Sequence, residues 1–315
     1  MNQNKNKIFV IVKWIVMLAA YSFLIVKLAR IEYWNELKDT FQHVDINRIS
    51  LLILILVLLP INWWLESVKW QYLMKNSLSL SIRSAVKSVL AGISTGYITP
   101  NRVGDFAGRI LYLPKECRVT GVVMSVLNSI TQNIIITVFG VVGATLFLSE
   151  NYKDNGFSHF LFWIQLWIFA TVLFIVLLPY LSKKLKLGKW SKKINESVQS
   201  LSSFRFNDLF RILLISTLRY GVYCIQYFLM RQFFQIEVSV LQALIAIPAM
   251  YLFITFTPSL AASEPAIRGS YAVLIFSSFS TNNIGIMLTG IMIWLINFVV
   301  PMLLGTVVIG RTKVE

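Results

Sequence analysis

The chain has 315 residues, of which 57% are hydrophobic and only 14% are charged, and its mean hydropathy is +0.69. A soluble domain usually carries about 25% charged residues, so this chain has too little charge to cover a water-exposed surface of its size. The composition excludes a soluble globular domain, a disordered chain and a secreted disulfide scaffold. It predicts an all-α, polytopic integral membrane protein.

The charge is strongly biased, with 29 Lys and Arg against 14 Asp and Glu, a net charge of +15. In a membrane protein such an excess is typical of cytoplasmic loops that lie near anionic lipid headgroups. The sequence contains no RNP-like strand, zinc knuckle or basic recognition helix, so we expect no nucleic-acid partner. His, Cys and acidic residues do not cluster with metal-ligand spacing, so we expect no metal and no cofactor.

Six apolar runs are long enough, or nearly so, to cross a hydrocarbon core of about 30 Å as helices. They cover residues 8–29, 49–65, 119–148, 160–181, 209–230 and 284–309. The first run is longer than the apolar core of a signal peptide, so we expect a retained span. Two further stretches, 85–113 and 241–279, are apolar but interrupted by Pro, Gly, Ser, Thr and ionisable residues. The pattern predicts one transmembrane domain, residues 1–315, with about six full spans.

Lys and Arg are concentrated in segments 1–7, 66–87 and 182–208 and at the C-terminal end of the sequence. These segments share one side if the N-terminus is cytoplasmic, so the positive-inside rule predicts cytoplasmic N- and C-termini for a multi-pass protein of the cell (inner) membrane. Segment 182–208 also carries regularly spaced apolar residues. It is either an amphipathic helix on the inner leaflet or a solvated basic linker.

The two interrupted stretches resemble each other. Each contains Thr-Pro, then a small or polar turn, then an acidic residue, then an Arg four positions after the acid. The matching pairs, 158 or 159 positions apart, are Pro100 and Pro258, Asp105 and Glu264, and Arg109 and Arg268. Because this offset is half the chain length, it predicts a duplication into halves of approximately 1–157 and 158–315.

The order of the apolar runs predicts that the two halves are inverted. Each interrupted stretch is preceded by two runs and followed by one, and the loop charges start the halves on opposite sides of the membrane. Two re-entrant helical hairpins that meet near the midplane are then expected, as in many secondary transporters. Proline breaks the helical hydrogen bonding, and irregular backbone at membrane depth must be buried or line a wet cavity. The alternative is an ordinary kinked helix or a pair of short spans in each stretch.

Polar and charged side chains in these stretches are candidate substrate-binding residues, because a charge at mid-bilayer costs about 2.5–3.5 kcal/mol and needs a partner or water. The candidates are Thr99, Asn101, Arg102, Asp105, Arg109, Glu264 and Arg268. The acid-first spacing of four predicts the ion pairs Asp105–Arg109 and Glu264–Arg268, which would neutralise each other and fix the hairpins. We expect Arg102 to be unpaired and to bind an anionic headgroup, since guanidinium suits phosphate geometry.

Two polar stripes at helical spacing follow in the apolar runs. The first comprises Ser125, Asn128, Ser129 and Gln132, and the second Arg219, Tyr220, Tyr223 and Gln226. Such stripes either form hydrogen bonds between helices or line a path for a headgroup. No nucleophile–base set stands out, although Asp105 and Glu264 could act as general acid and base if the hairpins touch.

The segment from Thr99 to Asp105, Thr-Pro-Asn-Arg-Val-Gly-Asp, together with Arg109, resembles the first hairpin of the lysylphosphatidylglycerol synthase transmembrane family. This is the flippase-like region of the multiple peptide resistance factors. Thr257-Pro258 through Glu264 is similar to the family's Pro-Gly-Gly-Leu-Gly segment that ends in Glu. The resemblance covers nearly the whole chain, and it implies that Arg102, Asp105, Arg109 and Glu264 are the positions to test.

The family's glycines in the second hairpin are replaced by Ser259, Ala261 and Ala262, which stiffens the turn. The sequence lacks the soluble aminoacyl-transferase domain of the full-length family members, so lysyl transfer is not expected. The resemblance implies lipid handling: a lipid flippase or transporter that moves a polar, anionic phospholipid or glycolipid between leaflets, with membrane lipids as partners and a homodimer left open. The alternatives are a membrane-embedded transferase acting on a lipid carrier, a small-anion secondary transporter and a non-transporting membrane scaffold.

Overall fold

The structure is a computed structural model that describes residues 45–151, 200–260 and 263–310. Within these ranges every regular element is helical, which confirms the predicted all-α class. The predicted spans 8–29 and 160–181, most of the basic segment 182–208 and both predicted cytoplasmic termini lie outside the described residues.

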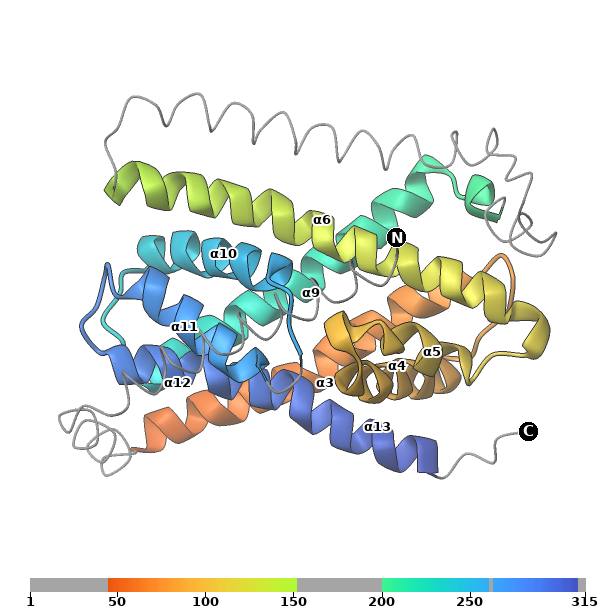
Figure 1. The fold of residues 1–315 in the computed structure, drawn as a ribbon, viewed down its shortest axis with the longest axis horizontal. Coiled ribbons are helices and arrows are strands. Elements are labelled where there is room, and N and C mark those ends of the chain that lie inside the picture. Colours follow the sequence, from red (N-terminus) through yellow and green to blue (C-terminus); the bar gives the residue numbers. More distant parts are fainter. Residues whose placement is uncertain (1–44, 152–199, 261–262, 311–315) are drawn as a thin grey trace, which may run out of the picture.

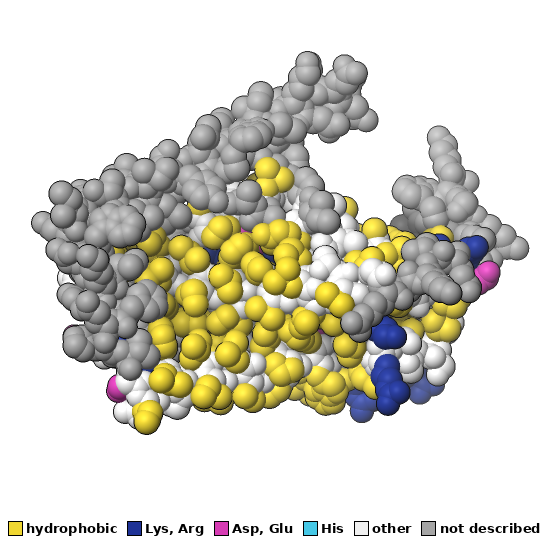
Figure 2. Space-filling model, turned by 90° about the horizontal axis from the view of Figure 1, so that it is seen from below, with side chains coloured by type: hydrophobic (Ala, Val, Ile, Leu, Met, Phe, Trp, Pro, Cys, Tyr) yellow, Lys and Arg dark blue, Asp and Glu magenta, His cyan; other side chains and the backbone are white. Residues whose placement is uncertain are grey.

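Four long helices in the described part of the chain are apolar enough to cross a membrane. They are α3 (Ile46–Met74), α6 (Arg118–Asn151), α9 (Phe206–Phe233) and the run from α12 (Asn283–Trp294) through a π-helical turn (Leu295–Val299) into α13 (Val300–Gly310). They confirm the helices predicted from runs 49–65, 119–148, 209–230 and 284–309. A broad hydrophobic face, with most of its charged side chains near the ends, is consistent with lipid contact (Figure 2).

Each interrupted stretch forms two helices joined by an irregular turn. The first hairpin consists of α4 (Ile82–Ile98), a 3-10 turn (Pro100–Arg102) and α5 (Gly104–Ile110). The second consists of α10 (Val240–Phe256) and α11 (Glu264–Phe276). Helices α4 and α10 each have 17 residues and begin 158 positions apart, and each starts after a serine, Ser81 or Ser239, whose side chain caps the first turn.

The turn of the first hairpin holds an unusual backbone. Asn101 and Arg102 have φ values of 50° and 58°, in the left-handed region that non-glycine residues rarely adopt. The Thr99 hydroxyl accepts a hydrogen bond of 2.7 Å from the backbone N–H of Gly104, which satisfies a free donor at the start of α5. Thr99 therefore fixes the direction in which α5 leaves the turn.

Helices far apart in the sequence pack side by side: α6 lies along α10, α13 along α4, and α3 packs on α9 (Figure 1). Small residues permit the close approach. A side chain at Gly140 of α6 would meet Leu252 and the Pro248 carbonyl, and one at Gly305 of α13 would meet the Leu90 carbonyl and Ser94. Leu90 and Ser94 stand 158 positions before Pro248 and Leu252.

The boundary of α3 corrects one prediction. Lys69 was expected in a cytoplasmic segment, 66–87, because the apolar run ends at Leu65. Helix α3 instead continues to Met74, and Lys69 is 0% exposed. The helix continues through this polar region because its charged side chains have partners inside the protein.

Candidate functional site: a polar cavity between the two hairpins

A cavity of about 620 Å³ lies between the two hairpins and the helices α3, α6 and α9. Seven charged side chains line it, namely Arg102, Arg109, Arg219, Arg268, Glu66, Asp105 and Glu264. Amide, hydroxyl and aromatic side chains supply much of the remaining wall, among them Asn62, Asn128, Gln132, Tyr223 and Phe298. The size is within the range of about 300–1,000 Å³ that is usual for small-molecule sites.

The turns of the two hairpins touch at the cavity. The backbone N–H of Asn101 donates to the Ser259 carbonyl at 3.2 Å, and the N–H of Ser259 donates to the Asn101 side chain at 3.1 Å. Asn101 and Ser259 are 158 positions apart, so the hairpins meet at matching positions. The left-handed backbone at Asn101 lies at this junction.

Arg102 forms the charged link between the hairpins. Its guanidinium donates two hydrogen bonds to the two carboxylate oxygens of Glu264, at 2.9 and 2.6 Å. It also lies 3.7 Å from the centre of the Phe298 ring, a distance suited to a cation–π contact. The prediction that Arg102 is unpaired is therefore wrong. Glu264 comes from the opposite half of the chain, and the partnership depends on how the hairpins are packed.

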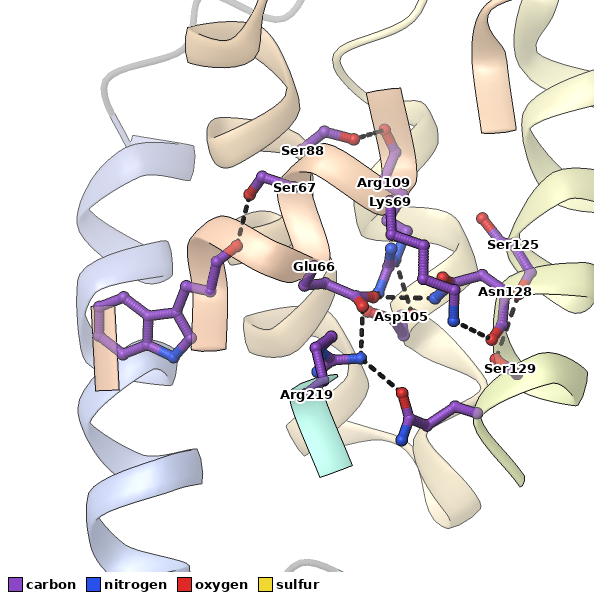
Figure 3. Close-up of polar contacts among 12 residues, drawn as sticks. Glu66, Ser67, Lys69, Ser88, Asp105, Arg109, Ser125, Asn128, Ser129 and Arg219 are labelled. Carbon is purple, nitrogen blue, oxygen red and sulfur yellow. Dashed lines mark hydrogen bonds and ion pairs between the residues drawn. The ribbon is translucent and has the colours of Figure 1, made fainter. Parts of the chain in front are cut away.

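A first group of polar residues, which we call the Glu66 cluster, comprises Glu66, Lys69, Asp105, Arg109, Asn128 and Arg219 (Figure 3). One Glu66 oxygen accepts from Arg109 at 2.5 Å and from the Asn128 amide at 2.8 Å. The other pairs with Arg219. Glu66 is 4% exposed, so its carboxylate lies among groups of the protein itself.

Arg219 and Lys69 complete the cluster from opposite sides. Arg219 donates to the side-chain oxygens of Asn62 and Gln132, at 3.1 Å each, in addition to its pairing with Glu66. Lys69 does not line the cavity; its ammonium donates to the backbone carbonyl of Asn128 at 3.0 Å. Three helices, α3, α6 and α9, are thus tied together at this point.

The second group, the Glu264 cluster, comprises Arg102, Tyr223, Glu264, Arg268, Trp294 and Phe298. The Trp294 indole N–H donates to Glu264 at 2.8 Å. Arg268 donates to the Tyr223 hydroxyl at 2.8 Å and lies 4.8 Å from the Phe298 ring centre. The π-helical turn at 295–299 shifts the helical register where it supplies Phe298, a use often seen at functional sites.

The predicted ion pairs have different geometries. Asp105 and Arg109 form the expected pair, with 2.8 Å between the carboxylate and Nε. Glu264 and Arg268 are 3.9 Å apart, because the Glu264 oxygens bond to Arg102 and Trp294 instead. Of the seven predicted site residues, six line the cavity, and Thr99 is not among the lining residues.

The members of the polar stripes divide between the cavity and the helix interfaces, and a headgroup path stays a prediction. Asn128, Ser129 and Gln132 line the cavity, as do Arg219, Tyr220 and Tyr223, and several also bond between helices. Ser125 and Gln226 are 0% exposed. They donate to the backbone carbonyls of Gly121 and Ile55, so they serve packing alone.

Sequence reasoning missed Asn62, Glu66 and Lys69, and also Trp294 and Phe298. The first three are spaced four and three positions apart in α3, so they lie on one face of the helix. This polar face would have been visible in the sequence if the predicted helix had been extended beyond Leu65. Trp294 and Phe298 belong to an almost wholly apolar run. Nothing in their sequence context distinguishes them from lipid-facing residues.

Comparisons with known proteins identify the family. Residues 10–305, nearly the whole chain, match the model described as the lysylphosphatidylglycerol synthase TM region. No curated protein and no solved structure matches the chain significantly. The family and the four long apolar helices together make this a multi-pass membrane protein. The chain therefore belongs to the lysylphosphatidylglycerol synthase TM region family.

Proposed function

We propose that this protein moves a polar, anionic phospholipid or glycolipid between the two leaflets of the membrane, with the headgroup in the cavity and the acyl chains in the surrounding lipid. The family supports a function connected with membrane lipids. The observation that carries the proposal is a cavity lined by four arginines and three carboxylates at the point where two helical hairpins meet. The charged and polar side chains of such a lining can replace the water molecules that a charged headgroup loses when it leaves the aqueous phase.

The lengths of the hairpin helices support a re-entrant arrangement. At 1.5 Å per residue, the seven residues of α5 extend only about 10 Å and the 13 of α11 about 20 Å, both short of a hydrocarbon core of about 30 Å. A helix this short cannot continue to the opposite side of the membrane. A chain that enters the membrane through α4 or α10 and turns into such a helix therefore leaves on the side where it entered. The turn then lies at membrane depth.

We further propose that the halves are inverted repeats related by a pseudo-two-fold axis in the membrane plane. Three observations support this. The paired helices α4 and α10 match in length and cap, the packing of α6 on α10 parallels that of α13 on α4, and residues at matching positions touch. Asn101 meets Ser259, and Asn62 meets Arg219, which is 157 positions later. In this arrangement the Arg102–Glu264 link would open when one half rocks against the other.

Lipid exchange in liposomes tests the proposal. The purified full-length protein is reconstituted with fluorescent phosphatidylglycerol, and transfer between leaflets is followed by chemical quenching of the outer leaflet. We expect exchange well above that of protein-free liposomes, and at least tenfold slower exchange in Arg102→Ala and Glu264→Ala. Lys75→Ala is the matched control, because Lys75 pairs with Asp208 in a partly exposed ion pair and does not line the cavity.

Other results would each contradict lipid transport. A covalent lipid product without exchange would indicate a membrane-embedded transferase, and uptake of a soluble anion without lipid exchange would indicate a small-anion transporter. Folded protein that shows none of these activities would indicate a membrane scaffold. Wild-type exchange rates in both cavity variants would exclude this cavity as the pathway.

A further inference from the structure

The two clusters contain matching arginines with different partners. Asp105 and Arg109 stand 159 positions before Glu264 and Arg268, and Glu66 stands 157 positions before Tyr223. In the Glu66 cluster, Arg109 bonds to both carboxylates, at 2.8 Å to Asp105 and 2.5 Å to Glu66. A tyrosine therefore occupies the position in the second half that the glutamate occupies in the first.

This replacement leaves Arg268 short of negative charge. Its matching acid, Glu264, accepts two hydrogen bonds from Arg102 and one from Trp294, and lies 3.9 Å from Arg268. Arg268 is 8% exposed, and its Nε has no hydrogen-bond partner among the described residues. A buried N–H group without a partner is costly, and a ligand in the cavity would supply one. Arg109 Nη1 in the Glu66 cluster likewise has no hydrogen-bond partner among the described residues, so the contrast between the two arginines rests on their carboxylate partners.

The lining of the cavity shows the same imbalance. Beside the Glu66 cluster, the two lining arginines, Arg109 and Arg219, contact two carboxylates. Beside the Glu264 cluster, Arg102 and Arg268 share the single carboxylate of Glu264. Among the lining residues, one positive charge is thus left over on the side of the second hairpin. Lys69, which donates to the Asn128 carbonyl and does not line the cavity, adds a positive charge to the Glu66 cluster as well.

The aromatic ring of Phe298 keeps the two arginines of this side together. The guanidinium carbons of Arg102 and Arg268 lie 3.7 and 4.8 Å from the ring centre, and cation–π attraction offsets part of their mutual repulsion. Both arginines line the cavity, and guanidinium groups are donors that suit the oxygens of a phosphate.

We propose that Arg268 and Arg102, flanked by the Tyr223 hydroxyl, form an anion subsite for the oxygens of a phosphate group whose negative charge is not balanced by a cation on the same molecule. The pairing of the Glu66 carboxylate with Arg109 is the internal model for this ligand, because the phosphate would supply Arg268 with the negative charge that Tyr223, at the matching position, does not carry. The subsite rests on the proposed function and locates the phosphate in one half of the cavity. The chemistry is the same for a lipid headgroup and for free phosphate, and the experiment separates these sources.

The decisive variant is Tyr223→Glu, which supplies the second half with the carboxylate of the first. It should neutralise Arg268 and occupy the subsite. Titration calorimetry of the purified full-length protein in detergent micelles measures the binding of short-chain phosphatidylglycerol, inorganic phosphate and short-chain phosphatidylcholine. We expect wild type to bind phosphatidylglycerol, inorganic phosphate or both more tightly than phosphatidylcholine, and Tyr223→Glu to weaken the binding of the anion at least tenfold.

The matched control is Ser50→Glu, which adds the same charge at an exposed position near the start of α3, outside the cavity lining. Its affinity for the anion should stay within about threefold of wild type. If Tyr223→Glu fails to fold, Arg268→Gln takes its place, with the same expected loss. Binding of phosphatidylglycerol alone assigns the subsite to a lipid headgroup, and binding of inorganic phosphate alone assigns it to a soluble anion.

The proposal is overturned if Tyr223→Glu binds like wild type, if Ser50→Glu weakens binding equally, or if phosphatidylcholine binds as tightly as both anions. Lipid exchange, measured on the same preparations, separates this proposal from the proposed function. If wild type shows no lipid exchange but its anion binding is lost in Tyr223→Glu, the subsite is supported and lipid transport is rejected. Exchange by wild type with unaltered binding in Tyr223→Glu retains transport and rejects the subsite.

Discussion

The two charged clusters differ in what satisfies their arginines. In the Glu66 cluster, the carboxylates of Glu66 and Asp105 both pair with Arg109, and the side chains of Glu66 and Arg109 are almost completely buried. In the Glu264 cluster, Arg268 donates to a tyrosine, and Arg102 is about one-third exposed. We propose that the two clusters are matching positions of a repeat, one holding a closed ion-pair network and the other an open one. In this proposal the closed network stabilises the helix packing, and the open one is available for a ligand.

The largest expected effect breaks the closed network. Glu66→Gln removes the carboxylate that compensates Arg109 and Arg219. Because loss of one partner leaves an uncompensated buried charge, we expect about 3–5 kcal/mol of destabilisation. Thermal unfolding in detergent, followed by circular dichroism, measures it.

The control for this prediction is Tyr223→Phe, at the matching position of the second half. It removes one hydrogen bond to Arg268 and should cost only about 0.5–1.5 kcal/mol. Equal losses in the two variants would contradict the distinction between a closed and an open cluster.

A second prediction concerns the close packing of α13 on α4. Gly305→Ala would place a methyl group against the Leu90 carbonyl and the Ser94 hydroxyl, so α13 must move away from α4. We expect about 1–3 kcal/mol of destabilisation. Among the described residues, a side chain at Gly221 of α9 would meet no atom within 4 Å, so Gly221→Ala should instead stabilise the helix by about 0.5–1 kcal/mol. Destabilisation of the same size in both variants would show that helix contact is not the cause.

A third prediction concerns the contact between the turns of the two hairpins. Asn101→Ala removes the acceptor of the Ser259 N–H and places alanine at a φ of 50°. Each change costs about 1 kcal/mol, so we expect a loss of about 2 kcal/mol. Asn101→Gly tolerates this backbone and should lose only the hydrogen bond. If glycine is worse than alanine in thermal unfolding, the left-handed turn does not contribute to stability.

The smallest expected effect is at the surface. Asp208→Asn breaks the ion pair with Lys75, whose side chain is 33% exposed. Solvent screens such pairs, so we expect a loss of about 0.2–1 kcal/mol that shrinks as salt is added. The loss in Glu66→Gln should change little with salt, because its partners are buried. Equal salt dependence would contradict the burial of the Glu66 cluster.

Much of the architecture could be predicted from the sequence. The apolar runs identified the four long helices of the described chain, and the Thr-Pro turns identified the breaks between α4 and α5 and between α10 and α11. Six of the seven predicted site residues line one cavity. The helices and their breaks were predicted correctly because they rest on local physics, namely the length needed to cross lipid and the effect of proline on a helix. The cost of charge in an apolar segment pointed to the residues that line the cavity, and their role in binding a substrate stays a prediction.

The sequence by itself determined which segments are helical, where the helices break and which charged residues need partners, because each of these follows from residues close together along the chain. Only the tertiary structure decided which partners they take. Arg102 pairs with Glu264, 162 positions away, and Glu66 pairs with Arg219. Local spacing cannot specify such pairs, since they depend on how the hairpins and helices pack in space. The charge left over at Arg268 is likewise a property of the assembled cavity.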